Sequence, residues 1–131
     1  MQSILIADDS RLLRTRVRSS LGDFPYRVFD AANGQAGLDI AKSRTIDLLV
    51  VDVNMPLMGG LEMMVRLRSC VGYQRTPVFF MTTEPRVDDA LTGARLGATG
   101  WVAKPFNPGL LSRAIHKVLL TVDSSRQATG T

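Results

Sequence analysis

Acidic, hydroxyl and ammonium side chains stand directly after four short apolar runs in this chain. The runs occupy residues 4–7, 48–51, 78–81 and 101–103. The groups that follow them are Asp8, Asp9, Asp52, Thr82 and Lys104. If the runs are parallel strands, three carboxylates, a hydroxyl and an ammonium meet at one edge of one sheet. Carboxylate oxygens suit a hard divalent cation such as Mg²⁺, and an ammonium can hold a phosphoryl oxygen as a point charge.

Asp52 is the carboxylate best placed to attack phosphorus, because carboxylates act as nucleophiles in covalent phosphoryl transfer. Asp9 and Asp52 suit the cation, with Asp8 as an outer partner. Two like charges about 4 Å apart repel by about 4 kcal/mol at an effective dielectric constant of about 20. The cluster therefore requires a cation or a raised pKa, and Lys104 relieves part of the repulsion. Thr82 supplies a hydroxyl donor to another phosphoryl oxygen.

Segments of strand length alternate with segments of helical period along the chain. Strands are predicted at about residues 4–7, 26–31, 47–52, 78–82 and 99–103. Helices are predicted at about residues 10–22, 34–41, 61–70, 87–94 and 110–119. Ser10 is expected to cap the first helix and Gly22 to end it.

This alternation predicts an α/β domain in which five helices cover both faces of a five-stranded parallel sheet. In such sheets the functional crevice lies outside the carboxyl ends of the strands, which is where the polar groups stand. We expect one domain over residues 1–122. Residues 123–131 lack apolar anchors and are expected to form a flexible C-terminal tail.

Composition limits the classes of protein that fit. The 131 residues are 45% hydrophobic, within the usual range for one domain. The single cysteine, Cys70, forms no internal bridge, and a reducing cytoplasm is the expected setting. The first apolar run stops at Asp8, so it is interpreted as a strand rather than a signal peptide, and no run is long enough to cross a bilayer.

The formal charge of +4 comes from 16 Lys and Arg against 12 Asp and Glu. An anionic partner would fit this charge. The simpler interpretation, which we prefer, is that the arginines of the first helix form its solvated side; they are Arg11, Arg14, Arg16 and Arg18. No zinc-finger or aromatic-interleaved basic motif is visible, so direct nucleic-acid binding is not expected.

Together, the motifs resemble the signature of the CheY-like receiver domain of two-component response regulators. The pieces are Asp8-Asp9, Asp52-x-Asn54-Met55-Pro56-x-Met58-x-Gly60, Thr82 and Lys104-Pro105-Phe106. The resemblance covers the chain from about residue 2 to residue 120. It implies a flavodoxin-like, doubly wound (βα)5 fold with strand order 2-1-3-4-5.

The resemblance also implies the roles of the acidic residues. Asp52 would accept a phosphoryl group from a phosphohistidine on a histidine kinase. Mg²⁺ would be bound by Asp9, Asp52 and the backbone carbonyl of Asn54, with Asp8 acting mainly through water.

Other residues would bind the phosphoryl group and report its presence. Thr82 and Lys104 would hold its oxygens, together with backbone amides near Asn54 and Thr83. Trp101 stands at the family's switch-aromatic position and would turn inward when Thr82 moves. The Lys104-Pro105 peptide is expected to be cis.

Asn54 and Glu84 stand two residues beyond Asp52 and Thr82, where the family tunes dephosphorylation. This pair resembles the chemotaxis branch, which implies a cytoplasmic monomer with a short-lived signal. Its output partner would be a protein such as a flagellar motor switch component, docked on the fourth helix, fifth strand and fifth helix. A separate phosphatase would be a further partner. The chain itself is not expected to be an enzyme beyond catalysing its own phosphorylation and dephosphorylation.

Two alternatives stay open. The chain could be a receiver cut from, or working with, a longer transcriptional regulator. It could also be a Mg-dependent aspartyl phosphatase, although such enzymes place a second acid where this chain has Asn54.

Overall fold

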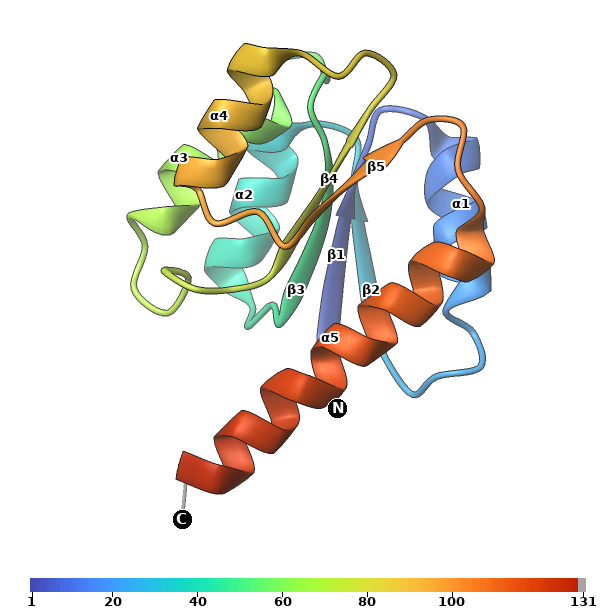
Figure 1. Ribbon diagram of the computed structural model, residues 1–131, viewed down its shortest axis with the longest axis vertical. Helices are drawn as coiled ribbons and strands as arrows, with labels where there is room; N and C mark the ends of the chain where they lie inside the picture. The colour runs from blue at the N-terminus through green and yellow to red at the C-terminus, as the bar shows by residue number, and fades with distance from the viewer. Residues whose placement is uncertain (130–131) are drawn as a thin grey trace.

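Strands and helices alternate from one end of the chain to the other in the computed structural model (Figure 1). The structure describes the backbone of residues 1–129 and the side chains of residues 1–122. The strands are β1 (Ser3–Ala7), β2 (Arg27–Ala31), β3 (Leu48–Asp52), β4 (Val78–Thr82) and β5 (Gly100–Ala103). The helices are α1 (Arg11–Ser20), α2 (Gly34–Ser43), α3 (Gly60–Arg68), α4 (Val87–Arg95) and α5 (Pro108–Thr129).

All five strands are parallel and lie in the order β2-β1-β3-β4-β5. The predicted fold class and strand order are therefore confirmed. The register pairs Ala7 with Val51, and Asp52 with Met81. Because this register aligns the carboxyl ends of the strands, the polar groups that end β3 and β4 and those that follow β1 and β5 come to one edge of the sheet.

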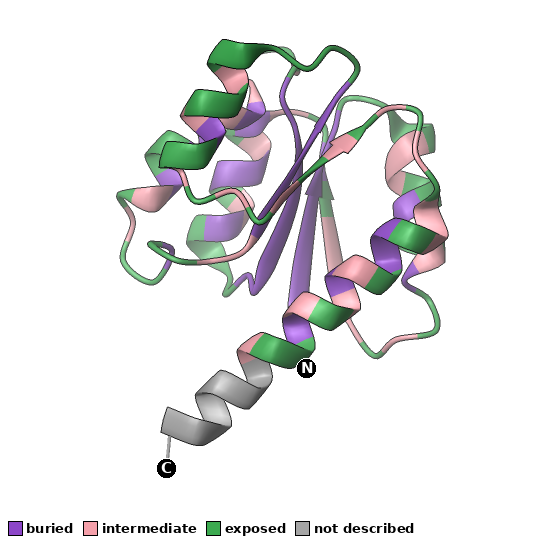
Figure 2. Cartoon of the chain, in the orientation of Figure 1, coloured by how far each residue is buried: buried purple, intermediate pink, exposed green. Residues whose placement is uncertain are grey.

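Each face of the sheet carries its own apolar core. On one face, Leu5, Val51 and Phe80 pack among the buried side chains of α2 and α3. On the other face, Ile6 and Val50 pack among those of α1 and α5. Because both faces are covered, β1, β3 and β4 are buried throughout (Figure 2), which explains their continuous apolar sequences.

Local capping explains where the first two helices begin. The Ser10 hydroxyl accepts a hydrogen bond from the Leu13 amide at 3.2 Å, as expected for an N-cap. The Asn33 side chain accepts one from Ala36 at 2.8 Å in the same way. Most predicted boundaries differ from the observed ones by two residues or fewer, but α5 runs to Thr129, beyond its predicted end at about residue 119. Helix α1 ends at Ser20 rather than at Gly22, since Leu21 already serves as its C-cap.

The C-terminal segment extends α5 in the structure as far as Thr129. Side chains beyond residue 122, and residues 130–131 altogether, lie outside the described part of the chain. The expected flexible tail over residues 123–131 therefore stays a prediction. Among the described residues, no helix is both long and apolar enough to cross a membrane.

Candidate functional site

Three acidic side chains converge at the carboxyl edge of the sheet. Asp8 and Asp9 follow β1, and Asp52 is the last residue of β3. One carboxylate oxygen from each lies within 4.8 Å of the other two. Asp8 is fully buried and Asp52 is 4% exposed, whereas Asp9 is exposed. The cluster therefore opens to solvent on the side of Asp9 and could hold a metal ion there.

Lys104 bridges the two buried acids. Its Nζ lies 2.7 Å from an Asp8 oxygen and 3.1 Å from an Asp52 oxygen. Burial lowers the pKa of Lys104, but the hydrogen bonds to Asp8 and Asp52 outweigh that effect and the pKa is raised overall. The lysine therefore stays charged, and three carboxylates with one ammonium leave two net negative charges.

The environment of Asp52 disfavours its charged form. Burial raises its pKa, and the neighbouring charge of Asp8 raises it further. Hydrogen bonds from Lys104 and from the Asn54 backbone lower it only in part. A divalent cation would match the remaining charge, and the ligands available are all hard oxygens, as Mg²⁺ prefers.

Asp8 is held in place by hydrogen bonds to both of its oxygens. The Ser10 amide donates to one oxygen at 2.7 Å, and Lys104 donates to the other. Arg14 donates to the Asp8 backbone carbonyl and, at 3.3 Å, to Asp30 on β2. The expectation that Arg14 is a solvated residue is therefore wrong, because its side chain is only 14% exposed. A sequence pattern gives no signal for this contact, since it depends on β2 lying beside β1.

The Thr82 hydroxyl is turned toward the loop that follows β4. It donates to the Glu84 carbonyl at 2.9 Å and accepts from the Glu84 amide at 3.1 Å. The residue is buried, whereas Thr83 and Glu84 are exposed. For Thr82 to hold a phosphoryl oxygen, as expected, its hydroxyl must leave Glu84.

The loop between β3 and α3 presents Asn54 beside the acids. Gly60 makes this possible, because a Cβ at that position would lie 2.2 Å from the Asp52 carbonyl oxygen. Only glycine lets α3 begin so close to the end of β3. On the opposite side of the site, the Lys104-Pro105 peptide is cis, as expected.

Trp101 lies away from the acids, on the edge strand β5. Its ring is 5.1 Å from the ring of Phe80, and the side chain is 37% exposed. The structure thus brings together Asp8, Asp9, Asp52 and Lys104, and leaves Thr82 and Trp101 directed elsewhere. The switch roles of these last two residues stay predictions.

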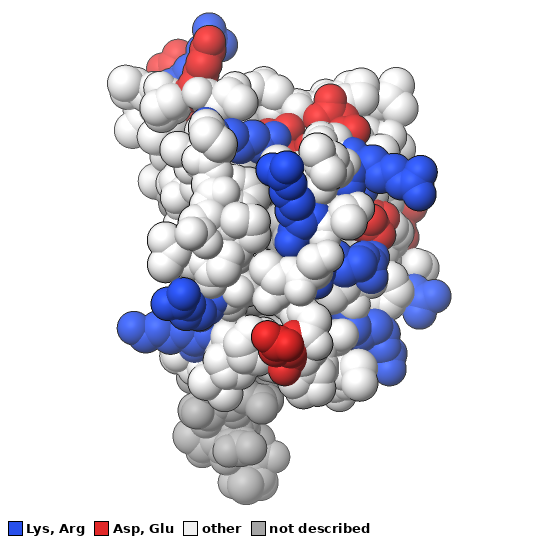
Figure 3. Space-filling model, turned by 90° about the vertical axis from the view of Figure 1, so that its right-hand side faces the viewer, with Lys and Arg blue, Asp and Glu red and all other residues white. Residues whose placement is uncertain are grey.

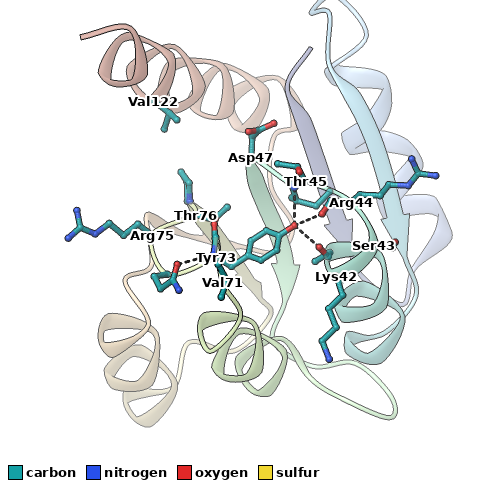
Figure 4. Close-up of a pocket in the computed structure, with 15 residues that line it drawn as sticks. Lys42, Ser43, Arg44, Thr45, Asp47, Val71, Tyr73, Arg75, Thr76 and Val122 are labelled. Carbon is teal, nitrogen blue, oxygen red and sulfur yellow. Dashed lines mark hydrogen bonds between the residues drawn. The ribbon is translucent and has the colours of Figure 1, made fainter. Parts of the chain in front are cut away.

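A large hollow of about 760 Å³ lies between the loops that precede β3 and β4 (Figure 4). These loops are at the opposite end of the strands from the acids. The Tyr73 hydroxyl accepts from the Ile46 amide and lies 2.6 Å from the carbonyl oxygens of Ala41 and Arg44. These hydrogen bonds join the two loops, so we interpret Tyr73 and the residues around the hollow as structural rather than functional.

Comparison with known proteins decides the family. The model of the response regulator receiver domain matches residues 4–116. The chain belongs to this family. The receiver domain accepts a phosphoryl group in two-component signalling, and it works with a histidine kinase and an output partner as a general property of the family.

Relatives of two kinds resemble this receiver domain. The transcriptional regulatory protein YvrH of Bacillus subtilis is 33% identical over 129 residues, 98% of this chain and 53% of that protein. The chain spans about half the length of the first curated relatives it matches. A CheY homologue of Campylobacter jejuni is 30% identical over 120 residues, 90% of this chain and 92% of that protein.

Solved structures agree with the fold. The chemotaxis protein CheY4 of Vibrio cholerae has a TM-score of 0.83 and 38% sequence identity, over 90% of this chain and 98% of that chain. A CheY-like receiver domain protein from Methanospirillum hungatei has a TM-score of 0.87 at 22% identity, which bears on the fold alone.

Proposed function

We propose that Asp52 is the phosphoacceptor of this receiver domain and that Mg²⁺ is required for the transfer. The observation that carries the proposal is the buried Asp52 carboxylate, held by Lys104 in a cluster with two net negative charges. Asp8, Asp9, Asp52 and the Asn54 carbonyl would hold the metal. When bound, Mg²⁺ would neutralise charge on the phosphoryl oxygens and the acids.

In the transfer, the protein's own groups supply the nucleophile and hold the phosphoryl oxygens. An oxygen of Asp52 attacks phosphorus, the phosphorus–nitrogen bond of phosphohistidine breaks, and its electron pair returns to the imidazole, which takes up a proton from solvent. Lys104 keeps its bond to Asp8 and turns from Asp52 to a phosphoryl oxygen. Thr82, with the amides near Asn54 and Thr83, binds the remaining oxygens.

Acetyl phosphate tests this step without a kinase. We expect intact-protein mass spectrometry to show one added phosphoryl group when Mg²⁺ is present, and none after chelation by EDTA. Asp52→Asn should abolish the product. Asp39→Asn, on the exposed side of α2, is the matched control and should not. Phosphorylation of Asp52→Asn to the wild-type extent would exclude Asp52 as the acceptor.

For the output, we propose chemotaxis or motility signalling through the face formed by α4, β5 and α5. Two CheY proteins that are 30% and 38% identical to this chain support the assignment. On this proposal Asn54 and Glu84 set a short lifetime, helped by a phosphatase, and the partner is a protein such as a flagellar motor switch component. The chain acts in the cytoplasm as a monomer and turns over no other substrate.

The length of the transcriptional relatives favours a second candidate, a receiver that works within a longer regulator. The reading frame around this sequence distinguishes the two candidates. A DNA-binding domain encoded after residue 131 would favour the second candidate. Binding of the phosphorylated chain to a purified motor switch protein, absent for Asp52→Asn, would favour the first.

The kinase is expected to meet a basic surface. Figure 3 shows Lys and Arg side chains gathered on the side of the molecule where α1 lies. Arg14 and Arg18 share Asp30, while Arg11 and Arg16 are exposed. An acidic kinase surface would complement this side.

A further inference from the structure

Gly93 occupies a special place in α4. The structure describes all of this helix, and Gly93 is its one buried residue. A Cβ at position 93 would lie 2.5 Å from Cζ2 of Trp101 and 3.2 Å from Cε2. The first distance is below the 3.0 Å that real Cβ atoms keep from other atoms, so the helix or the indole would have to shift. The indole therefore rests on the helix backbone, in the space that any larger residue would fill.

The indole also contacts the sheet. Trp101 pairs with Phe80 across β4 and β5, and their rings lie 5.1 Å apart at 33°. Phe80 is fully buried, so this ring cannot move without disturbing the core. Trp101 is thus held between a fixed ring and the backbone of α4, and it joins that helix to the sheet.

Two further contacts hold α4 and its preceding loop. At the C-terminal end, Arg68 Nε donates to the Leu96 carbonyl at 3.0 Å. Before the helix, Thr82 and Glu84 are joined by two hydrogen bonds. The N-cap residue, Arg86, makes no capping hydrogen bond through its side chain. The first of these contacts lies far from the acids, whereas the second involves a residue expected to bind the phosphoryl group.

We propose that Gly93 is a positioning residue, which sets how firmly α4 stays on Trp101 when Thr82 releases Glu84. This inference rests on the proposed function and adds the regulation of its site. Once Thr82 turns to the phosphoryl group, the contact between Gly93 and Trp101 still holds the middle of α4 against the sheet. A side chain at position 93 removes that hold in advance, so the helix is released without phosphorylation.

Trp101 fluorescence tests the contact directly, since it is the only tryptophan in the chain. In Gly93→Ala, before any phosphodonor is added, we expect emission and acrylamide quenching to be shifted in the same direction as beryllofluoride with Mg²⁺ shifts them in the wild type. The further change caused by beryllofluoride with Mg²⁺ should be smaller than in the wild type. The extent of Asp52 phosphorylation by acetyl phosphate should be no lower than in the wild type, because the coupling between the helix and the site acts in both directions.

A control variant separates packing from helix propensity. Ala94→Gly changes the next residue, which is exposed, and should leave Trp101 emission unchanged. Alanine is a better helix former than glycine, yet Gly93→Ala should lower the urea midpoint because of the clash. In a Trp101→Phe background, which removes the indole, the same substitution should raise the midpoint. Circular dichroism measures both, so the comparison holds even if Gly93→Ala is only partly folded.

Three results would overturn the proposal. The first is unchanged emission and quenching in Gly93→Ala, and the second is an equal fall in the urea midpoint in both backgrounds. The third is a wild-type protein that is phosphorylated on Asp52 with no change in Trp101 emission; the proposed function would then stand and the role of Gly93 would fall. Absence of phosphorylation in the wild type would instead refute both.

Discussion

The centre of this sheet and its β5 edge differ in how completely their residues are buried. Strands β1, β3 and β4, which carry the acids and Thr82, are buried at every position. Strand β5 alternates between half-buried and exposed residues, and α4 buries Gly93 alone. The acceptor site thus lies on a rigid base, the buried strands β1, β3 and β4. The adjacent β5 and α4 are held by a few separate contacts. A rigid base keeps the reacting groups in place, and a weakly held neighbour can move at small energetic cost.

The largest contrast should come from truncating one apolar side chain on each side. Leu5→Ala, in the fully buried core of β1, should destabilise the fold by about 3 kcal/mol because it leaves a cavity. Val87→Ala, on α4, removes a side chain that is 77% exposed and should change stability by less than about 0.5 kcal/mol. Urea denaturation measures both. Similar losses for the two variants would contradict the difference in packing.

Removing the bridging ammonium should have the next largest effect. Lys104→Met leaves two buried carboxylates without their cation, which should destabilise the fold by about 2 kcal/mol. Adding Asp8→Asn should recover much of the loss by removing one charge. Lys42→Met, at an exposed position on α2, is the control. A loss no larger than that of the control would show that the rigid base does not depend on this bridge.

Asp52→Asn should act in the opposite direction and stabilise the metal-free protein by about 1 kcal/mol at neutral pH. The pKa of Asp52 is raised on folding, so the wild type loses stability as pH rises from the ordinary value toward the raised one. The amide does not titrate. The advantage of Asn should therefore vanish at acid pH, where both forms are neutral. Thermal melts at several pH values without Mg²⁺ measure it, and a destabilising effect at neutral pH would contradict the direction of the shift.

The smallest effect should be a difference in amide hydrogen exchange between α4 and the central strands, measured within the native state. Amides of α4 should exchange faster than those of β1 and β3, because few buried contacts oppose local opening of the helix. Phosphorylation should speed exchange in α4 further and leave β1 unchanged. Equal protection of α4 and β1 amides from exchange, before and after phosphorylation, would contradict the difference in packing between α4 and the central strands.

Much of the fold and the acidic cluster could be predicted from the sequence for one physical reason. Apolar runs of strand length that alternate with helical periods require a parallel sheet, and such a sheet brings its carboxyl ends to one edge. Asp8, Asp9, Asp52 and Lys104 follow from that rule, since each stands where a run ends. Helix ends were less certain, as at Ser20, because capping depends on hydrogen bonds made in the final turn.

The tertiary structure alone decided where several side chains point. Arg14 reaches Asp8 and Asp30 only because β2 lies beside β1, and no local pattern encodes that neighbour. The Thr82 hydroxyl could bind a phosphoryl group or the loop that follows β4, and in the structure it bonds to the backbone of Glu84.

Gly93 shows most clearly the difference between what the sequence predicts and what tertiary packing decides. A glycine inside a helix predicts only lower helical stability. Its fit to Trp101 exists because packing brings α4 against β5. The sequence by itself therefore determined which chemistry gathers at the sheet edge, through the geometry of parallel strands. Tertiary packing decided which contacts connect that chemistry to the helix beside it, since those contacts join residues whose distance in sequence says nothing of their distance in space.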